Sequence, residues 1–193
     1  LYHAKKYEKA LTYLLMPDAR EEPKAQNLIA YLYDKGLGVE KNHELANEWY
    51  LKAAEKGYAK SQFNLGLSYE KGSGTPVNMK EAVKWYRKAA EQNHSRAEMK
   101  MGYFTVEGIG TKKDYKEALS WYRKAAENGD KRAYAYIGLF YDKGNGVKKN
   151  PNRAVQYYIM GAEKGDADAQ YFLGWAYYKG FGIKADAKQS LYW

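Results

Sequence analysis

Apolar and small residues recur at intervals of three and four along the chain, the spacing of one face of a helix. In the segment Ala59–Lys71, Leu65, Gly66 and Tyr69 share such a face. A glycine inside a helix costs about 1 kcal/mol relative to alanine, so we expect a neighbouring helix to approach closely at Gly66. The segment Gly72–Gly74 follows at once and favours a turn, because glycine adopts positive φ without strain. These patterns predict a helix that ends in a glycine turn.

A second helical pattern follows each glycine turn. One such pattern begins after Asn78, carries Trp85 and Tyr86, and closes near Gln92. Asparagine suits the N-cap because its side chain accepts a hydrogen bond from a free N–H of the first helical turn. The corresponding positions elsewhere hold Asn42, Asp114, Asn150 and Asp186. The chain therefore predicts pairs of helices joined by short turns.

The predicted helix pair recurs with a period of 36 residues. This spacing is kept by the pairs Trp49-Tyr50, Trp85-Tyr86 and Trp121-Tyr122, by the turn glycines Gly36, Gly72, Gly108, Gly144 and Gly180, and by the helix glycines Gly66, Gly102, Gly138 and Gly174. One helix pair cannot cover its own apolar face, so stacked neighbours must share a continuous core. The repeat therefore predicts an all-α protein.

The period also predicts how the chain is organised. We expect a single repeat domain over residues 1–193, with a partial repeat of one second helix at 1–22, full repeats at 23–58, 59–94, 95–130 and 131–166, and a truncated repeat at 167–193. Tyr7–Leu11 matches Tyr115–Leu119 three periods later, which supports the partial first repeat. Both ends cut through a repeat, so we expect a longer array. Leu1 is not an initiator methionine and no signal segment opens the chain, so we expect the native N-terminus and any targeting signal to be missing.

The repeated motif has a recognisable form. In its clearest copy, Leu65-Gly66, Tyr69, Gly72 and Gly74 are followed by Ala82, Trp85-Tyr86 and Lys88-Ala89-Ala90-Glu91. This pattern resembles the Sel-one-like repeat (SLR) family, which is related to tetratricopeptide repeats, over essentially the whole chain. The departures from the pattern are Tyr13 and Tyr157 for tryptophan, Ala30 for glycine, Thr105 for tyrosine and Asn93 for a closing glycine.

The resemblance implies both a fold and a class of function. The implied fold is a right-handed α-solenoid superhelix of 36-residue antiparallel helix pairs. Members of the family serve as adaptors in multiprotein assemblies, and many bacterial members are secreted, periplasmic or host-interacting. Some resemble immunity partners that neutralise a toxic effector. The resemblance therefore implies a bacterial protein that binds another protein, in a periplasmic or secreted location.

Composition and charge narrow the choice of partner. Hydrophobic residues make up 45% and charged residues 28% of the chain, the balance of a protein that buries a core. No run of about 18 apolar residues occurs, so no transmembrane helix is expected. Lysine and arginine outnumber aspartate and glutamate by 32 to 23, a net charge of +9, which favours an acidic segment or nucleic acid. The absence of cysteine excludes disulfides and thiolate metal sites.

Candidate catalytic residues do not form a known constellation. His3, His43 and His94 occupy different repeat positions, and no zinc, nucleophile-elbow or phosphate-loop motif occurs. The Gly-x-Gly pairs follow helices rather than strands, so we interpret them as turns. The repeated glutamates Glu55, Glu91, Glu127 and Glu163 end the second helices, and copies about 10 Å apart are poorly spaced for paired acid–base chemistry. We therefore expect no enzyme activity, no cofactor and no metal.

In each helix pair, the first helix has a scaffold face, which Leu65, Gly66 and Tyr69 form in the segment Ala59–Lys71. The stripe of residues on the opposite side of the first helices is the candidate binding site. By analogy with tetratricopeptide repeats, this stripe lines the concave groove. The partner-binding residues that we predict on it are Asn27, Tyr31, Lys60, Phe63, Leu67, Arg96, Met99, Tyr103, Arg132, Leu139, Tyr171 and Trp175, whereas Trp49, Trp85 and Trp121 are assigned to the scaffold. The alternative is that the apolar members pack between repeats and that the basic members are ordinary solvated surface.

An apolar and aromatic stripe with a basic rim predicts a non-catalytic scaffold or adaptor. Tyrosine and tryptophan supply contact area at low entropic cost, and arginine pairs with carboxylates, so a protein or peptide with an acidic segment is the favoured partner. An immunity-type role belongs to the same class, and the sequence does not separate the two. The alternative from another class is a nucleic-acid binder, since aromatics interleaved with basic residues stack on single strands. No recognised nucleic-acid module occurs, which ranks that alternative lower.

Overall fold

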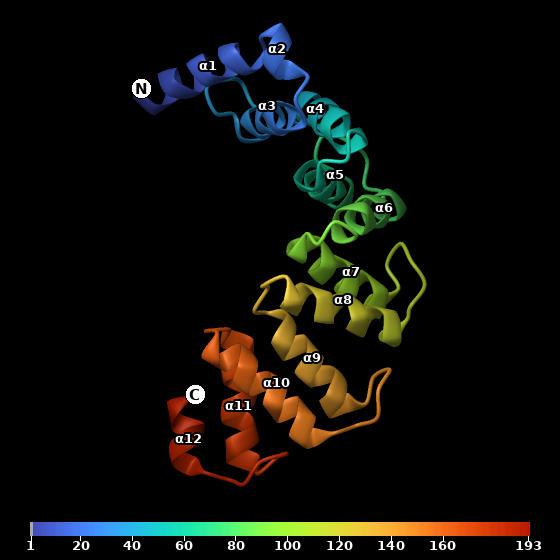
Figure 1. Ribbon diagram of the computed structural model, residues 1–193, viewed down its shortest axis with the longest axis vertical. Coiled ribbons are helices and arrows are strands. Elements are labelled where there is room, and N and C mark those ends of the chain that lie inside the picture. The colour runs from blue at the N-terminus through green and yellow to red at the C-terminus, as the bar shows by residue number, and fades with distance from the viewer. Residues whose placement is uncertain (1) are drawn as a thin grey trace. The chain divides into compact units, whose positions relative to one another are not determined.

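The computed structural model describes residues 2–193, with side chains from Lys5 onward. Within that range every regular element is helical (Figure 1). The helices are α1 (Tyr2–Leu14), α2 (Pro17–Arg20), α3 (Pro23–Lys35), α4 (His43–Glu55), α5 (Ala59–Lys71), α6 (Met79–Ala90), α7 (Ser95–Glu107), α8 (Tyr115–Glu127), α9 (Ala133–Lys143), α10 (Pro151–Glu163), α11 (Ala167–Lys179) and α12 (Ala187–Tyr192). The prediction of an all-α protein is confirmed.

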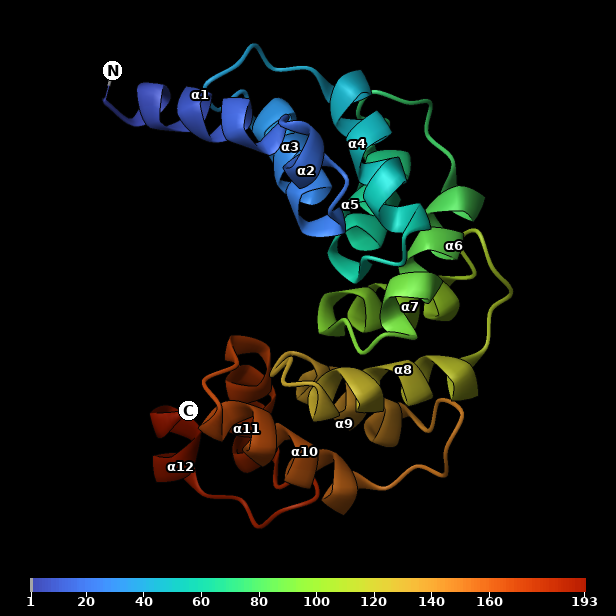
Figure 2. The ribbon, with the colours of Figure 1, turned by 45° about the horizontal axis from the view of Figure 1, so that its top comes forward.

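The helices pack in the order in which they occur along the chain. They form two compact units, one that ends at Ala97 and one that runs from Glu98 to Trp193. In the first unit α3 packs on α4, α4 on α5, and α5 on α6; in the second, α8 packs on α9, α9 on α10, α10 on α11, and α11 on α12 (Figures 1 and 2). This sequential packing of helix pairs confirms the predicted repeat architecture and is consistent with an α-solenoid.

The helix glycines allow close approach of the two helices in a pair. A Cβ atom built on Gly66 would lie 2.7 Å from the ring of Tyr86, and one built on Gly102 would lie 2.6 Å from the ring of Tyr122. Both tyrosines are buried. The expected packing reason for a glycine inside a first helix is therefore confirmed at Gly66 and Gly102.

The predicted N-caps of the second helices are present. Asn42 accepts a hydrogen bond from the N–H of Leu45 at 2.9 Å, and Asp114 accepts one from the N–H of Glu117 at 3.0 Å. The same type of cap is made by Asn78, Asn150 and Asp186. Asn93, which replaces a closing glycine, has a φ of 62°, so it adopts the left-handed conformation that the turn requires.

The second glycine of four of the turns contacts the preceding repeat. A Cβ on Gly38 would lie 2.6 Å from the backbone N of Glu8 in α1, and a Cβ on Gly146 would lie 2.9 Å from the backbone N of Lys116 in α8. Gly74 and Gly182 make the corresponding approaches to the first turns of α4 and α10. In this contact α1 takes the place that α4, α8 and α10 take for later repeats.

The short helix α2 is a feature that the repeat pattern does not predict. Its first residue is Pro17, and α3 likewise begins with Pro23, because proline is preorganised for the first helical position. Lys56 Nζ donates to the carbonyl oxygen of Glu21 at 2.5 Å and to its carboxylate at 3.1 Å, which ties the α2–α3 connection to the end of α4.

Candidate binding surface

Three aromatic side chains at one repeat position are exposed on the first helices. Tyr31 is 42% exposed on α3, Tyr103 is 47% exposed on α7, and Trp175 is 40% exposed on α11. Leu67 and Leu139, which occupy the same position in the other two repeats, are half-buried. These three rings are the exposed aromatic members of the predicted stripe, and each combines a large apolar area with a polar tip.

The flanking position behaves differently from repeat to repeat. Tyr171 is exposed, whereas Phe63 is buried and packs on the rings of Tyr86 and His94, with centroid separations of 5.6 and 4.7 Å. Asn27 is half-buried and its side-chain oxygen accepts a hydrogen bond from Ser61 Oγ at 2.9 Å. Met99 packs against the core of the second unit, and Ala135 is buried within it. Of the flanking residues, Tyr171 alone is exposed at the surface, whereas the other four are buried or half-buried.

An exposed aromatic stripe runs along α11. Tyr171, Trp175 and Tyr178 lie four and three residues apart, which places them on one face of the helix. Tyr171 and Tyr178 are each 67% exposed. Trp175 packs on Phe181, with a centroid separation of 5.3 Å. Tyr178 was not among the predicted binding residues; continuing the helical spacing by one more turn from Trp175 would have found it.

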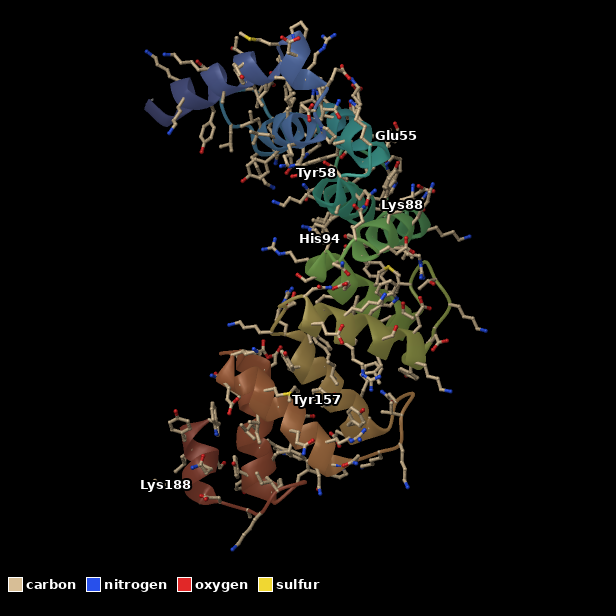
Figure 3. All side chains as sticks on the ribbon, in the orientation of Figure 1. Glu55, Tyr58, Lys88, His94, Tyr157 and Lys188 are labelled. Atoms are coloured by element: carbon tan, nitrogen blue, oxygen red, sulfur yellow. The ribbon has the colours of Figure 1, made fainter. Side chains whose placement is uncertain are left out.

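The predicted basic residues fall into two electrostatic situations. Lys60 and Arg96 are both exposed. The pKa of His94, which is labelled in Figure 3, is lowered by burial and then by the positive charges of Arg96 and Lys60. Arg132, by contrast, forms a two-pronged ion pair with Asp130, at 2.9 Å from Nε and 2.6 Å from its terminal nitrogen. The charge of Arg132 is therefore largely balanced within the chain, whereas Lys60 and Arg96 form no ion pair with any described residue.

A pocket of about 320 Å³ opens between α3 and α5 in the first unit. It contains two of the predicted residues, Tyr31 and Leu67. The remaining lining residues are polar or charged, namely Asp34, Lys35, Lys41, His43, Tyr50, Asn64, Ser68, Lys71 and Ser73. Asp34 is engaged by Lys35 at 2.7 Å and by His43 at 2.8 Å. The uncompensated charge of the lining is therefore positive.

The histidine and carboxylate side chains of the described residues are dispersed rather than clustered. They contain no group of three or more histidine and carboxylate side chains placed to hold a metal ion. The repeated glutamates Glu55, Glu91, Glu127 and Glu163 are exposed at the ends of the second helices. In the described part of the chain, every helix is too short or too polar to cross a bilayer.

One buried carboxylate is present, and its surroundings are structural. Glu98 is fully buried; its Oε1 accepts a hydrogen bond from Asn128 Nδ2 at 2.8 Å, while its Oε2 has no partner among the described residues. Burial raises the pKa of Glu98, and the bond from Asn128 opposes that shift. The same repeat position holds Gln62, whose amide accepts from Gln92 at 2.8 Å and donates to the Ala54 carbonyl at 3.1 Å. Glu98 thus occupies a position that holds glutamine in three other repeats, at Gln26, Gln62 and Gln170.

We expect Glu98→Gln to increase the free energy of unfolding by about 1–2 kcal/mol at neutral pH, because a buried charge with an unpaired oxygen is replaced by a neutral amide. The raised pKa of Glu98 in the folded state means that its charged form opposes folding at neutral pH. The gain should therefore disappear below about pH 4.5, the ordinary pKa of glutamate, where the parent carboxyl is protonated in both states. Urea titrations at pH 7 and pH 4 measure this difference, and an equal gain at both pH values would contradict it.

Comparison with known proteins identifies a repeat family and solved structures with the same architecture. The Sel1 repeat profile matches residues 23–58, 59–94, 95–130, 131–166 and 167–193. The chain is similar to a Sel1 repeat protein from Oxalobacter formigenes, with 75% identity over 100% of this chain and 79% of that one and a TM-score of 0.97. No curated protein matches the chain significantly.

Two further solved structures extend the comparison. A protective antigen of uropathogenic Escherichia coli with an SLR fold is 39% identical over 87% of this chain, which spans 36% of that antigen, with a TM-score of 0.84. An immunity protein from Pseudomonas aeruginosa is 21% identical over 98% of this chain and 78% of its own, with a TM-score of 0.56, and shares the fold alone.

The family is shown by both sequence and structure. The Sel1 matches cover every residue from 23 to 193, and the resemblance to Sel-one-like repeats drawn from the sequence is confirmed. Sel1 repeats form scaffolds that are generally non-catalytic and typically mediate protein interactions. The chain belongs to the Sel1 repeat family.

Proposed function

We propose that this chain is a non-catalytic scaffold that binds a protein or peptide partner through the exposed aromatic residues of its first helices. The observation that carries the proposal is the stripe of Tyr171, Trp175 and Tyr178 on α11, which leaves three large rings in solvent on one helix face. Aromatic residues of this kind dominate the binding energy of protein interfaces. Tyr31 and Tyr103 present single rings of the same type at the equivalent repeat position of Trp175.

The charges near these rings favour an acidic partner segment. In the first unit, the pocket beside Tyr31 and Leu67 is lined by Lys41 and Lys71 as well as by the paired Lys35. A carboxylate placed in this pocket would meet positive charge that the chain does not neutralise. Lys60 and Arg96 add further positive charge on the same unit.

The proposal covers both an adaptor role and an immunity-type role, because both roles require the chain to bind another protein. The likeness to the Pseudomonas aeruginosa immunity protein concerns the fold, so it does not favour one role over the other. A nucleic-acid binder remains the rival from another class, because of the net charge of +9. Its affinity would fall steeply as salt is raised, since binding releases counterions from phosphates.

The test compares three forms of the protein. Partners captured on the parent chain are identified by mass spectrometry, and the affinity of the strongest is then measured for the parent, for Tyr171→Ala/Trp175→Ala, and for Tyr13→Ala. Tyr13 is a matched control, because it is 66% exposed but lies on α1, which is not one of the first helices. Circular dichroism verifies that all three forms fold.

We expect the double variant to bind at least tenfold more weakly than the parent and the Tyr13 variant to bind as the parent does. Equal affinity of all three forms would place the site elsewhere on the chain. Capture of nucleic acid alone, with an affinity that falls by orders of magnitude between low and high salt, would favour the rival function.

A further inference from the structure

Two arginines of the second unit converge on one tyrosine hydroxyl. A terminal nitrogen of Arg123, on α8, donates to Tyr141 Oη at 3.0 Å, and a terminal nitrogen of Arg153, on α10, donates to the same oxygen at 3.4 Å. The guanidinium of Arg153 also lies over the Tyr141 ring, 5.6 Å from its centroid. Two positive charges from different repeats are thus held together at a single neutral oxygen.

This pair of charges is not balanced by an ion pair with any acidic side chain that the structure describes. Among the described residues, neither Arg123 nor Arg153 forms an ion pair. The first turn of α10, where Arg153 lies, contains no acidic residue, whereas Glu81 and Glu117 occupy the same repeat position in α6 and α8. The N-terminal end of a helix carries a partial positive charge, and the charge of Arg153 adds to it. The local electrostatic potential at this point is therefore positive.

The buried ring of Tyr141 fixes the position of its hydroxyl group, to which the two arginines donate. Tyr141 is buried, and its ring stacks on that of Tyr157, labelled in Figure 3, with a centroid separation of 5.5 Å and an interplanar angle of 9°. The guanidinium groups of Arg123 and Arg153 lower the pKa of Tyr141 against the raising effect of burial. Both arginines are themselves exposed. The buried ring therefore holds the hydroxyl in place, and the two guanidinium groups face solvent above it.

We propose that Arg123, Arg153 and the hydroxyl of Tyr141 form a binding site for a dianionic phosphate group. Two guanidinium groups match the charge of a phosphate dianion, and each offers paired N–H donors that fit its oxygens. The tyrosine hydroxyl accepts from the arginines and keeps its own proton to donate to a phosphate oxygen. A single carboxylate would leave one of the two charges unbalanced. The two arginines lie on the second helices α8 and α10 and Tyr141 lies on the first helix α9, so the site shares no residue with the aromatic stripe of α11.

Free phosphate and a phosphate monoester are the two sources of such a group, and the test includes both. Inorganic phosphate and O-phosphoserine are each titrated into the parent chain by isothermal calorimetry at constant ionic strength, with serine and acetate as blanks. Comparable affinities for the two phosphates indicate a site that accepts an esterified group, and binding of inorganic phosphate alone indicates a site for the free ion. Either result supports the proposal.

The variants locate the binding. We expect Arg123→Gln and Arg153→Gln each to weaken phosphate binding at least tenfold, because each removes a charge-assisted pair of hydrogen bonds. Tyr141→Phe keeps the buried ring and should weaken binding by a smaller factor. Lys148→Gln is the matched control, since it removes one exposed positive charge from a loop of the same unit and should leave binding unchanged.

Two results would overturn the proposal. The first is a parent chain that binds inorganic phosphate no more tightly than acetate. The second is equal phosphate binding by the parent, Arg123→Gln and Arg153→Gln, with circular dichroism showing that all three are folded. Because both arginines are exposed and glutamine retains a long polar side chain, these variants should keep the fold.

Discussion

Replacing Trp85 by alanine should lower the free energy of unfolding by about 3–5 kcal/mol, the cost of removing a large aromatic side chain from a core. Trp85 is 5% exposed and belongs to a cluster of buried residues that includes Tyr50, Leu65 and Ala54. Lys88 covers its outer face, with Nζ 4.4 Å from the ring centroid. Urea unfolding followed by circular dichroism measures the loss, which should fall on the first unit.

The matched control is Trp175→Ala, which removes the same side chain from the surface. Trp175 is 40% exposed and packs mainly on Phe181, so the loss should be about 1 kcal/mol. Trp85→Phe is a second control: the indole N–H of Trp85 has no hydrogen-bond partner among the described residues, so phenylalanine forfeits volume but no bond. Equal losses for Trp85→Ala and Trp175→Ala would contradict the division between scaffold and surface tryptophans.

Replacing Gly102 by alanine should lower the free energy of unfolding by about 1–3 kcal/mol through overpacking, although alanine is intrinsically the better helix former. The new Cβ would lie 2.6 Å from the ring of Tyr122. That ring cannot easily move, because Tyr136 stacks on it at 4.8 Å and Phe140 meets it edge-on at 5.7 Å. The loss is measured by urea or thermal unfolding.

Gly174→Ala is the control at the same repeat position. The nearest atoms to a Cβ on Gly174 are the carbonyl oxygen of Ser190 at 3.3 Å and Trp193 at 3.5 Å, so a small adjustment accommodates it. Ala30 already occupies this position in the first full repeat and is fully buried. We expect Gly174→Ala to be neutral or to stabilise by up to about 1 kcal/mol. Similar destabilisation at both glycines would mean that backbone flexibility, rather than ring packing, sets the requirement.

Features that depend on neighbouring residues could be predicted from the sequence. The N-cap of Asn78 needs only a side-chain oxygen three residues before a free N–H, and the turn at Gly72 needs only a positive φ. The recurrence of Gly66 and its counterparts predicted the close approach of a neighbouring helix, although not that Tyr86 makes the contact. These local requirements repeat every 36 residues, which makes each copy a check on the others.

Features that depend on residues or loops that are not repeated along the chain could not be predicted in this way. The burial of Phe63 arises because His94, at the end of the same repeat, folds over its ring, and the repeat pattern contains no second copy of that histidine. The pocket beside Tyr31 depends on the path of the loop that carries Lys41. The convergence of Arg123 and Arg153 involves position 153, where the two preceding repeats have glutamate, so the repeat pattern did not predict an arginine there.

The order of packing has a consequence for how such chains change length during evolution. Hydrogen bonds between repeats join residues about one period apart, as from Ser61 to Asn27 and from Lys131 to the carbonyl oxygen of Gly165, each 34 positions away. Duplicating or deleting 36 residues in frame therefore gives the recurring scaffold residues at the new junction neighbours of the same kind as before. Arrays with different numbers of repeats can then arise by unequal recombination within one gene, because the added repeats form the same core contacts as the existing ones.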